Sequence, residues 1–124
     1  MILICGIPNA GKTTYSSQFK KVIHCDDVIG RNRLVKIIAM IKDDPSVCVE
    51  GVCERALERK RFVEASNEYN KCIWLNVPVD ECIKREINGR NRSVHMVQWA
   101  YEDFEPPTYD EGWDEIEVIK YEHI

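Results

Sequence analysis

Phosphate chemistry is the first possibility that the residue types of this chain suggest, and the signal comes from its N-terminal stretch. The pattern Gly-x-x-x-x-Gly-Lys-Thr, from Gly6 to Thr13, matches the phosphate-binding loop G-x-x-x-x-G-K-[ST] at every specified position. Glycines allow backbone N–H groups to point together at phosphate oxygens, where a side chain would block the approach. Lys12 adds a cation for the β- and γ-phosphates, and the Thr13 hydroxyl can bind Mg²⁺.

The flanks of this loop supply the context that the motif needs. Apolar residues 2–5 precede it, as in a strand buried on both faces. The helix expected over residues 12–20 follows it and adds the positive end of its dipole. We therefore expect ATP and Mg²⁺ to bind here, with nucleotide contacts from Gly6, Pro8, Asn9, Ala10, Gly11, Lys12, Thr13 and Thr14.

Acidic residues follow two further apolar runs. Asp26 and Asp27 come at the end of the run 22–25. One of these carboxylates is expected to orient or deprotonate an acceptor hydroxyl, and the other to cap the next helix. Glu50 follows the run 47–49 and is a candidate metal carboxylate that holds Mg²⁺ through water, although a solvated acid at a strand end is the simpler alternative.

A basic segment near residue 90 is a candidate lid over the phosphates. Arg85, Arg90 and Arg92 flank Gly89, which interrupts an otherwise helical pattern. Guanidinium groups bind phosphate oxygens in bidentate fashion and stay charged at any physiological pH. A solvated basic helix face is the alternative, but a glycine between arginines suits a mobile clamp better.

Apolar runs that alternate with helical patterns must position these side chains. The runs expected to form strands are 2–5, 22–25, 47–49, 72–77 and 116–119. Helical spacing occupies the segments 12–20, 28–42, 54–69, 81–88 and 94–104. This alternation predicts an α/β fold of the P-loop NTPase type, with a parallel five-stranded sheet, flanking helices and an arginine lid, in a single domain over residues 1–124. Ligands bind beyond the carboxyl ends of such strands, where the phosphate loop and the acidic residues are expected.

Two expectations concern packing. The helix over 54–69 is expected to bury Leu57, Phe62, Ala65 and Tyr69. Trp74 and Trp99 are expected in the core rather than as platforms for a ligand, and Trp113 fits either place.

Composition indicates an ordinary globular chain of 124 residues, 44% hydrophobic and 31% charged. No apolar run approaches the length of about 20 residues that a membrane span needs. The six cysteines form no C-x-x-C pair, so we expect free, mostly buried thiols. These features predict an intracellular protein of a reducing compartment with no membrane partner, and the short chain is compatible with a viral origin.

Charge is unevenly distributed along the chain. Residues 102–124 carry nine acidic residues and one lysine, whereas residues 1–101 have sixteen basic and twelve acidic residues. The body is therefore mildly basic despite a net charge of −4. Such a body permits a phosphate-bearing substrate.

Three separated stretches give the chain a resemblance to the polynucleotide 5′-kinase family, both phage-type and the kinase domain of the mammalian kinase–phosphatase. The first is the loop from Gly6 to Thr14, and the second is Ile23-His-Cys-Asp-Asp-Val-Ile-Gly30. The third runs from Cys82-Ile-Lys-Arg-Glu to Tyr101-Glu-Asp-Phe-Glu-Pro-Pro-Thr-Tyr-Asp-Glu-Gly-Trp113. It resembles the lid arginines and the Phe-Glu-x-Pro-Thr segment of the mammalian-type domain.

The resemblance implies specific roles. Lys12 and Thr13 would hold ATP·Mg²⁺, and Asp26 would be the general base, with Asp27 as the fallback. The clamp on the phosphates would consist of Arg85 and either Arg90 or Arg92. Phage-type members carry an arginine three residues after the base that contacts the substrate phosphate; this chain has Ile29 there, with Arg31 close by.

We therefore expect an ATP-dependent kinase that phosphorylates the 5′-hydroxyl end of DNA or RNA. The first alternative is a small-molecule or nucleotide kinase of the same fold. The second is a nucleotide-binding interaction module without catalysis.

Overall fold

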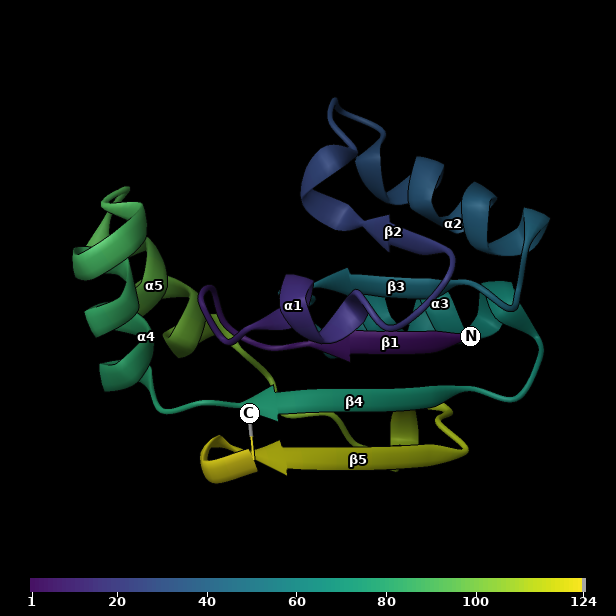
Figure 1. The fold of residues 1–124 in the computed structure, drawn as a ribbon. Helices are drawn as coiled ribbons and strands as arrows, with labels where there is room; N and C mark the ends of the chain where they lie inside the picture. Colours follow the sequence, from purple (N-terminus) through teal and green to yellow (C-terminus); the bar gives the residue numbers. More distant parts are fainter. Residues whose placement is uncertain (124) are drawn as a thin grey trace.

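Five parallel strands form one sheet in the computed structural model, which describes residues 1–123. The strand order is β2-β3-β1-β4-β5, so the strand that leads into the phosphate loop lies in the centre (Figure 1). This confirms the predicted fold class. The strands are β1 (Ile2–Cys5), β2 (Val22–His24), β3 (Cys48–Gly51), β4 (Lys71–Asn76) and β5 (Glu115–Lys120).

Helices cover the sheet, and two of them lie beyond the carboxyl ends of its strands. In Figure 1, α1 lies in front of the sheet and α3 behind it, while α4 and α5 stand past the carboxyl ends of the strands. A π-helical turn, Glu86–Arg90, continues α4 toward α5. The helices are α1 (Lys12–Ser16), α2 (Arg33–Asp43), α3 (Ala56–Ser66), α4 (Val79–Arg85) and α5 (Val94–Asp103).

Alternating side chains of the central strand supply two hydrophobic cores. Leu3 and Cys5 enter the core shared with α2 and α3, and Ile4 enters the core shared with α4 and α5. A strand with a core on each face must be apolar without interruption, which explains the run at its start. All six cysteines are buried and free, as expected. Within residues 1–123, no helix is long and apolar enough to cross a membrane.

The first helix is shorter than predicted, five residues instead of nine. Side chains after Thr14 bond back to the carbonyls of the preceding turn: Ser16 Oγ donates to the Thr13 oxygen at 2.9 Å and Ser17 Oγ to the Thr14 oxygen at 2.6 Å. Such local bonds compete with the helical ladder. The helix predicted over 28–42 likewise begins only at Arg33.

The expected packing of two helices is partly wrong. Phe62 is buried in α3, but Leu57 is exposed, and Tyr69 is exposed because the helix ends before it, at Asn67 in the left-handed conformation. Trp99, expected in the core, lies exposed on α5. Trp74 is half-buried and Trp113 is buried.

The largest fully buried side chain of α3 is an arginine, which hydrophobic periodicity could not predict. Arg59 is 0% exposed. Its guanidinium donates to both carboxylate oxygens of Glu111, at 2.7 and 3.0 Å, and to the carbonyls of Cys53 and Glu105. Trp113 Nε1 also donates to Glu111. The pair therefore ties the segment 105–113 to the chain just after β3.

We predict that Arg59→Ala lowers the free energy of unfolding by about 3–5 kcal/mol, because it leaves the Glu111 carboxylate buried without its cation. Urea unfolding followed by tryptophan fluorescence measures the change. Arg61→Ala, at an exposed position of the same helix, is the matched control and should change it by no more than about 0.5 kcal/mol. Equal losses in the two variants would contradict this assignment.

Candidate active site

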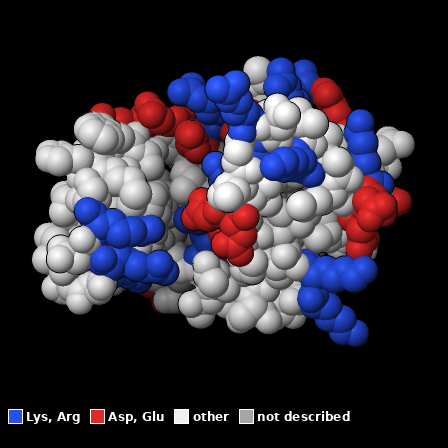
Figure 2. All heavy atoms as spheres, turned by 90° about the horizontal axis from the view of Figure 1, so that it is seen from above, with Lys and Arg blue, Asp and Glu red and all other residues white. Residues whose placement is uncertain are grey.

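A cavity of about 740 Å³ opens beyond the carboxyl ends of β1, β2 and β3. Its volume falls in the range of small-molecule sites. Figure 2, seen from above, shows the surface hollowed there, with basic side chains on the lobe at the left and acidic ones across the hollow. Most of the predicted site residues line this one cavity: Pro8, Asn9, Gly11, Lys12, Thr13, Thr14, Asp26, Glu50, Arg85, Arg90 and Arg92.

Three predicted residues lie outside the cavity lining. Gly6 and Ala10 are buried in the loop. A Cβ at Gly6 would come within 2.9 Å of the Leu75 carbonyl oxygen, so glycine here lets the loop pass the backbone of β4. Asp27 is exposed, and only its neighbour Asp26 lines the cavity.

The phosphate loop presents a buried cation and a helix start to the cavity. Gly11 precedes α1 with a φ of +95°, a conformation that favours glycine. The first N–H groups of a helix have no partner within it, so those of α1 are available to an anion. Lys12 Nζ donates to the Ile7 carbonyl at 2.9 Å. Burial lowers the pKa of Lys12, and the charge of Glu50 partly offsets this effect.

Oxygen ligands meet beside this lysine. Thr13 Oγ1 donates to Glu50 Oε2 at 3.3 Å, and Glu50 is 5% exposed. His24 Nδ1 lies 2.7 Å from the same carboxylate oxygen and fixes its direction. His24 and Glu50 are register partners in β2 and β3. Among the described residues, no group of three or more His, Cys, Asp or Glu side chains forms a metal site.

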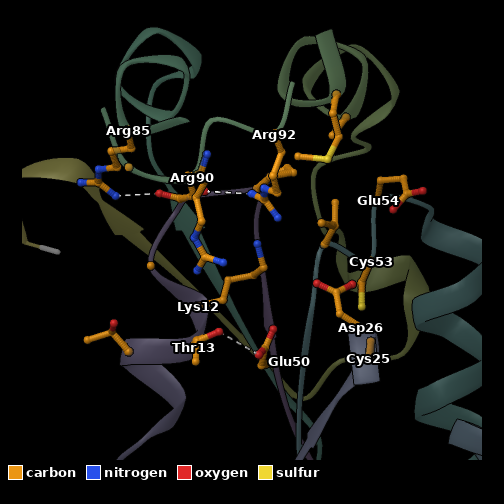
Figure 3. A pocket seen from close by; sticks show the side chains of 18 of the residues that line it. Lys12, Thr13, Cys25, Asp26, Glu50, Cys53, Glu54, Arg85, Arg90 and Arg92 are labelled. Atoms are coloured by element: carbon orange, nitrogen blue, oxygen red, sulfur yellow. Dashed lines mark hydrogen bonds between the residues drawn. The ribbon is translucent and has the colours of Figure 1, made fainter. Parts of the chain in front are cut away.

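The three lid arginines differ in how they are held (Figure 3). Arg85 Nη1 donates to the Asn9 carbonyl at 2.7 Å. Arg92 Nη2 lies 3.0 Å from Glu86 Oε1, whose carboxylate is 1% exposed. Arg90 points into the cavity above Lys12 and, within the described part of the chain, has no hydrogen-bond or ion-pair partner.

The opposite end of the cavity is acidic. Asp26 lies in a 3-10 turn, Cys25–Asp27, directly after β2, and its side chain is 84% exposed. Arg33 is the cation of this end; its Nη2 lies 3.5 Å from Asp26, and its Nε donates to the Cys25 carbonyl. Glu54 and Glu58 also line this end, and burial followed by the Glu54 charge raises the pKa of Glu58.

Several residues of the site, in the cavity lining or in contact with it, escaped the sequence analysis. His24 could have been found from the strand register, because parallel strands that end together place their last residues side by side. Arg33 carried no signal, since it lies seven residues beyond Asp26 in an expected helix. Others become part of the site only through tertiary folding: Cys25, Cys53, Glu54, Glu58, Met96 and Ala100.

The Glu86 carboxyl group makes the stability of the fold depend on pH. Bonds from Arg92 and then Asn9 lower the pKa of the Glu86 carboxyl group from 4.5 to about 2. A carboxyl group with a lowered pKa in the folded state stabilises the fold above its unfolded pKa, and this contribution is lost as pH falls through the folded value.

We predict that the melting temperature of the wild type exceeds that of Glu86→Gln near pH 7. The gap should narrow as pH falls from about 4.5 toward about 2. A gap independent of pH, measured by circular dichroism, would refute the assignment.

Similar folds occur among solved structures. A gluconokinase from Sinorhizobium meliloti matches with a TM-score of 0.72 and 14% identity, covering 96% of this chain and 81% of the other. A sugar kinase from Janibacter sp. matches at 0.76 and 11%, with 96% and 83% covered. Kti12 of Chaetomium thermophilum, in complex with ADP-AlF₃, matches at 0.75 and 11%, with 97% and 88% covered. No protein-family model and no curated protein matches the sequence. At these identities the likeness shows only the fold that this chain shares with these proteins, and the resemblance to polynucleotide kinases stays a prediction.

Proposed function

We propose that this chain transfers the terminal phosphoryl group of ATP to an alcohol. One observation carries the proposal: a single cavity joins the phosphate loop and the lid arginines at one end to the strand-end carboxylate of Asp26 at the other. Phosphoryl transfer needs these parts, because catalysis consists mainly of positioning and of offsetting charge on the transferred group. The fold shared with a gluconokinase and with Kti12 in complex with ADP-AlF₃ supports the same class of reaction.

The residues present fit a magnesium ion bound together with the nucleotide. Thr13 and Glu50 offer a hydroxyl and a carboxylate that lie within hydrogen-bond distance of each other, and oxygen ligands are what Mg²⁺ prefers. Mg²⁺ keeps several waters and phosphate ligands, so it does not need three protein carboxylates. When bound, the ion would supply charge stabilisation for the phosphates. His24 would keep Glu50 directed toward Thr13.

In this reaction Asp26 accepts the proton of the acceptor alcohol. The alcohol oxygen forms a bond to the γ-phosphorus while the bond from that phosphorus to the β–γ bridging oxygen breaks, and ADP leaves. Lys12 and Arg90 offset the negative charge of the phosphates, because both point to the cavity at its loop end.

For the acceptor we propose the 5′-hydroxyl end of DNA or RNA. Arg33 supports this choice, because it puts a guanidinium beside Asp26, where the phosphate of an adjoining nucleotide could bind. Ile29, the position at which phage-type kinases carry an arginine, is exposed and outside the cavity lining. Arg33 would therefore replace it.

A small hydroxylated molecule is the second candidate acceptor, and a specific observation favours it. Asp26, Glu54 and Glu58 place three carboxylates against the single cation of Arg33 at this end of the cavity. Carboxylates repel phosphodiesters but accept hydrogen bonds from the hydroxyl groups of sugars and nucleosides.

The acceptor is identified by incubating the chain with γ-labelled ATP and a panel of alcohols. We expect label on 5′-hydroxyl oligonucleotides and none on the same oligonucleotides with a 5′-phosphate. Arg33→Ala should raise the oligonucleotide KM about tenfold through loss of a charge-assisted bond, and Arg31→Ala, which lies outside the cavity lining, should change it less than about twofold. Label on sugars or nucleosides alone would select the second candidate, and ATP binding without transfer to any alcohol would indicate a binding module.

The two adjacent acids allow a matched test of the general base. We predict that Asp26→Asn lowers kcat by about 10²–10⁴-fold, because the amide cannot accept the proton. Asp27→Asn, one residue away and outside the cavity lining, should stay within about twofold of the wild type. Initial rates at saturating ATP and acceptor measure both. A larger loss in Asp27→Asn than in Asp26→Asn would exchange their roles.

A further inference from the structure

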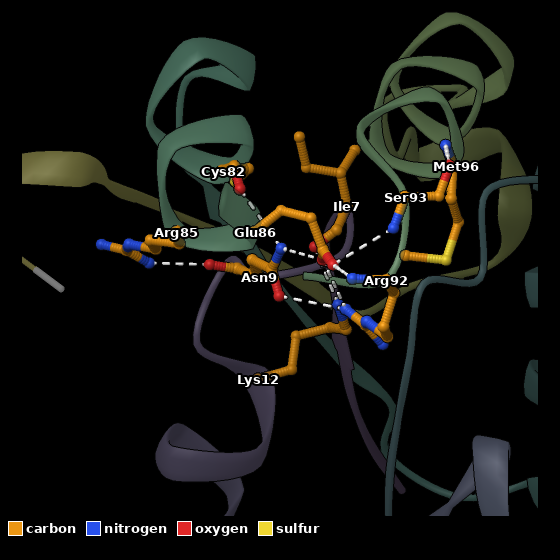
Figure 4. Close-up of polar contacts among 9 residues, drawn as sticks. All are labelled: Ile7, Asn9, Lys12, Cys82, Arg85, Glu86, Arg92, Ser93 and Met96. Carbon is orange, nitrogen blue, oxygen red and sulfur yellow. Dashed lines mark hydrogen bonds and ion pairs between the residues drawn. The ribbon is translucent and has the colours of Figure 1, made fainter. Parts of the chain in front are cut away.

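Glu86 lies at the contact between the lid, residues 85–92, and the phosphate loop (Figure 4). Its carboxylate is 1% exposed and lies in the π-helical turn that connects α4 to α5. Oε1 accepts from Asn9 Nδ2 at 2.9 Å and from Arg92 Nη2 at 3.0 Å. Oε2 accepts from the backbone N–H groups of Arg92 and Ser93. Every bond therefore uses this side chain as an acceptor, which a neutral amide could not reproduce.

On the phosphate-loop side, this contact is made by Asn9. Its φ of +72° is in the left-handed region, which asparagine tolerates better than most residues. The amide nitrogen donates to Glu86 and to the Cys82 carbonyl, while the amide oxygen accepts from Arg92 Nη2 at 3.2 Å. An amide can satisfy a carboxylate and a guanidinium at once because it carries both a donor and an acceptor. This explains an asparagine at a position that the loop motif leaves open.

Positive charges crowd the loop end of the cavity, and this crowding explains why a carboxylate lies between the lid and the phosphate loop. Lys12, Arg85, Arg90 and Arg92 gather at the loop end of the cavity, where they repel one another until an anion binds. Glu50 lies near Lys12 and Glu81 pairs with Arg85, while buried Glu86 is the carboxylate that bonds to Arg92 and holds its guanidinium against the loop rather than in solvent. Arg90 lacks such a tether within the described part of the chain, so the lid combines two tethered arginines, Arg85 and Arg92, with a free one.

We propose that Glu86 is a positioning residue: together with Asn9, it holds the Arg92 guanidinium over the phosphate loop before the nucleotide arrives. This rests on the proposed nucleotide binding. Arg92 is then pre-organised for the phosphates, which lowers the cost of ordering a long side chain at the moment of binding. Arg90 supplies the part of the clamp that moves.

The first test uses the nucleotide-free protein and does not depend on the proposed activity. The guanidinium Nη–H resonances of Arg92, identified by their loss in Arg92→Ala, should be separate and sharp in the wild type because rotation of the group is restrained. They should average in Glu86→Gln. Glu102→Gln, an exposed carboxylate of α5, is the matched control and should leave them sharp. Averaged signals already in the wild type would overturn the proposal.

The second test is a double-mutant cycle on the affinity for a non-hydrolysable ATP analogue with Mg²⁺. We expect Arg92→Ala and Glu86→Gln each to weaken binding about tenfold, and the double variant to bind no worse than Arg92→Ala alone. Glu102→Gln should bind within about twofold of the wild type. If Glu86→Gln does not fold, Asn9→Gly takes its place, since glycine keeps the left-handed backbone and removes only the amide. Additive losses would overturn the positioning role, whereas no binding by the wild type would overturn the nucleotide site itself.

Discussion

The parallel direction of all five strands is the constraint on which the site depends. Because every strand ends at the same edge, the loop after β1, the carboxylate of Glu50 in β3 and the turn after β2 open onto one cavity. The central place of β1 brings its loop close to both neighbours. This close approach requires glycine at position 6, because no side chain fits between the loop and the Leu75 carbonyl. A side chain at this position would force the loop or the Leu75 backbone to move.

The cavity is divided by charge, and the division follows from which elements reach it. The lid between α4 and α5 and the phosphate loop supply cations, which suit a triphosphate. The turn after β2 and the start of α3 supply carboxylates, with Arg33 as the cation among them. Such a division distinguishes a donor end from an acceptor end. It also explains why the acceptor is the less constrained half of the proposal, because any phosphate that binds there must compete with three carboxylates for the guanidinium of Arg33.

Much of this arrangement could be predicted from the sequence, because it rests on local signals. The apolar runs gave the strands, the loop motif gave the phosphate end, and the strand-end positions of Asp26 and Glu50 placed both in the cavity. Features that depend on tertiary contacts escaped. Burial of Arg59 requires Glu111, which lies 52 residues away, and Glu86 requires Asn9, 77 residues away. Hydrophobic periodicity also predicted too long a helix for α3, because the helix ends at Asn67, before Tyr69 can reach the core.

The central claim is that the N-terminal loop grips the phosphates of a nucleotide in this cavity. The most direct measurement is an amide chemical-shift titration of the isotope-labelled chain with ATP·Mg²⁺, repeated with Lys12→Ala. The account predicts saturable shifts that are largest at residues 8–14, with weaker and smaller changes at the same amides in the variant. Shifts scattered over the surface, or none in the loop at millimolar nucleotide, would contradict it.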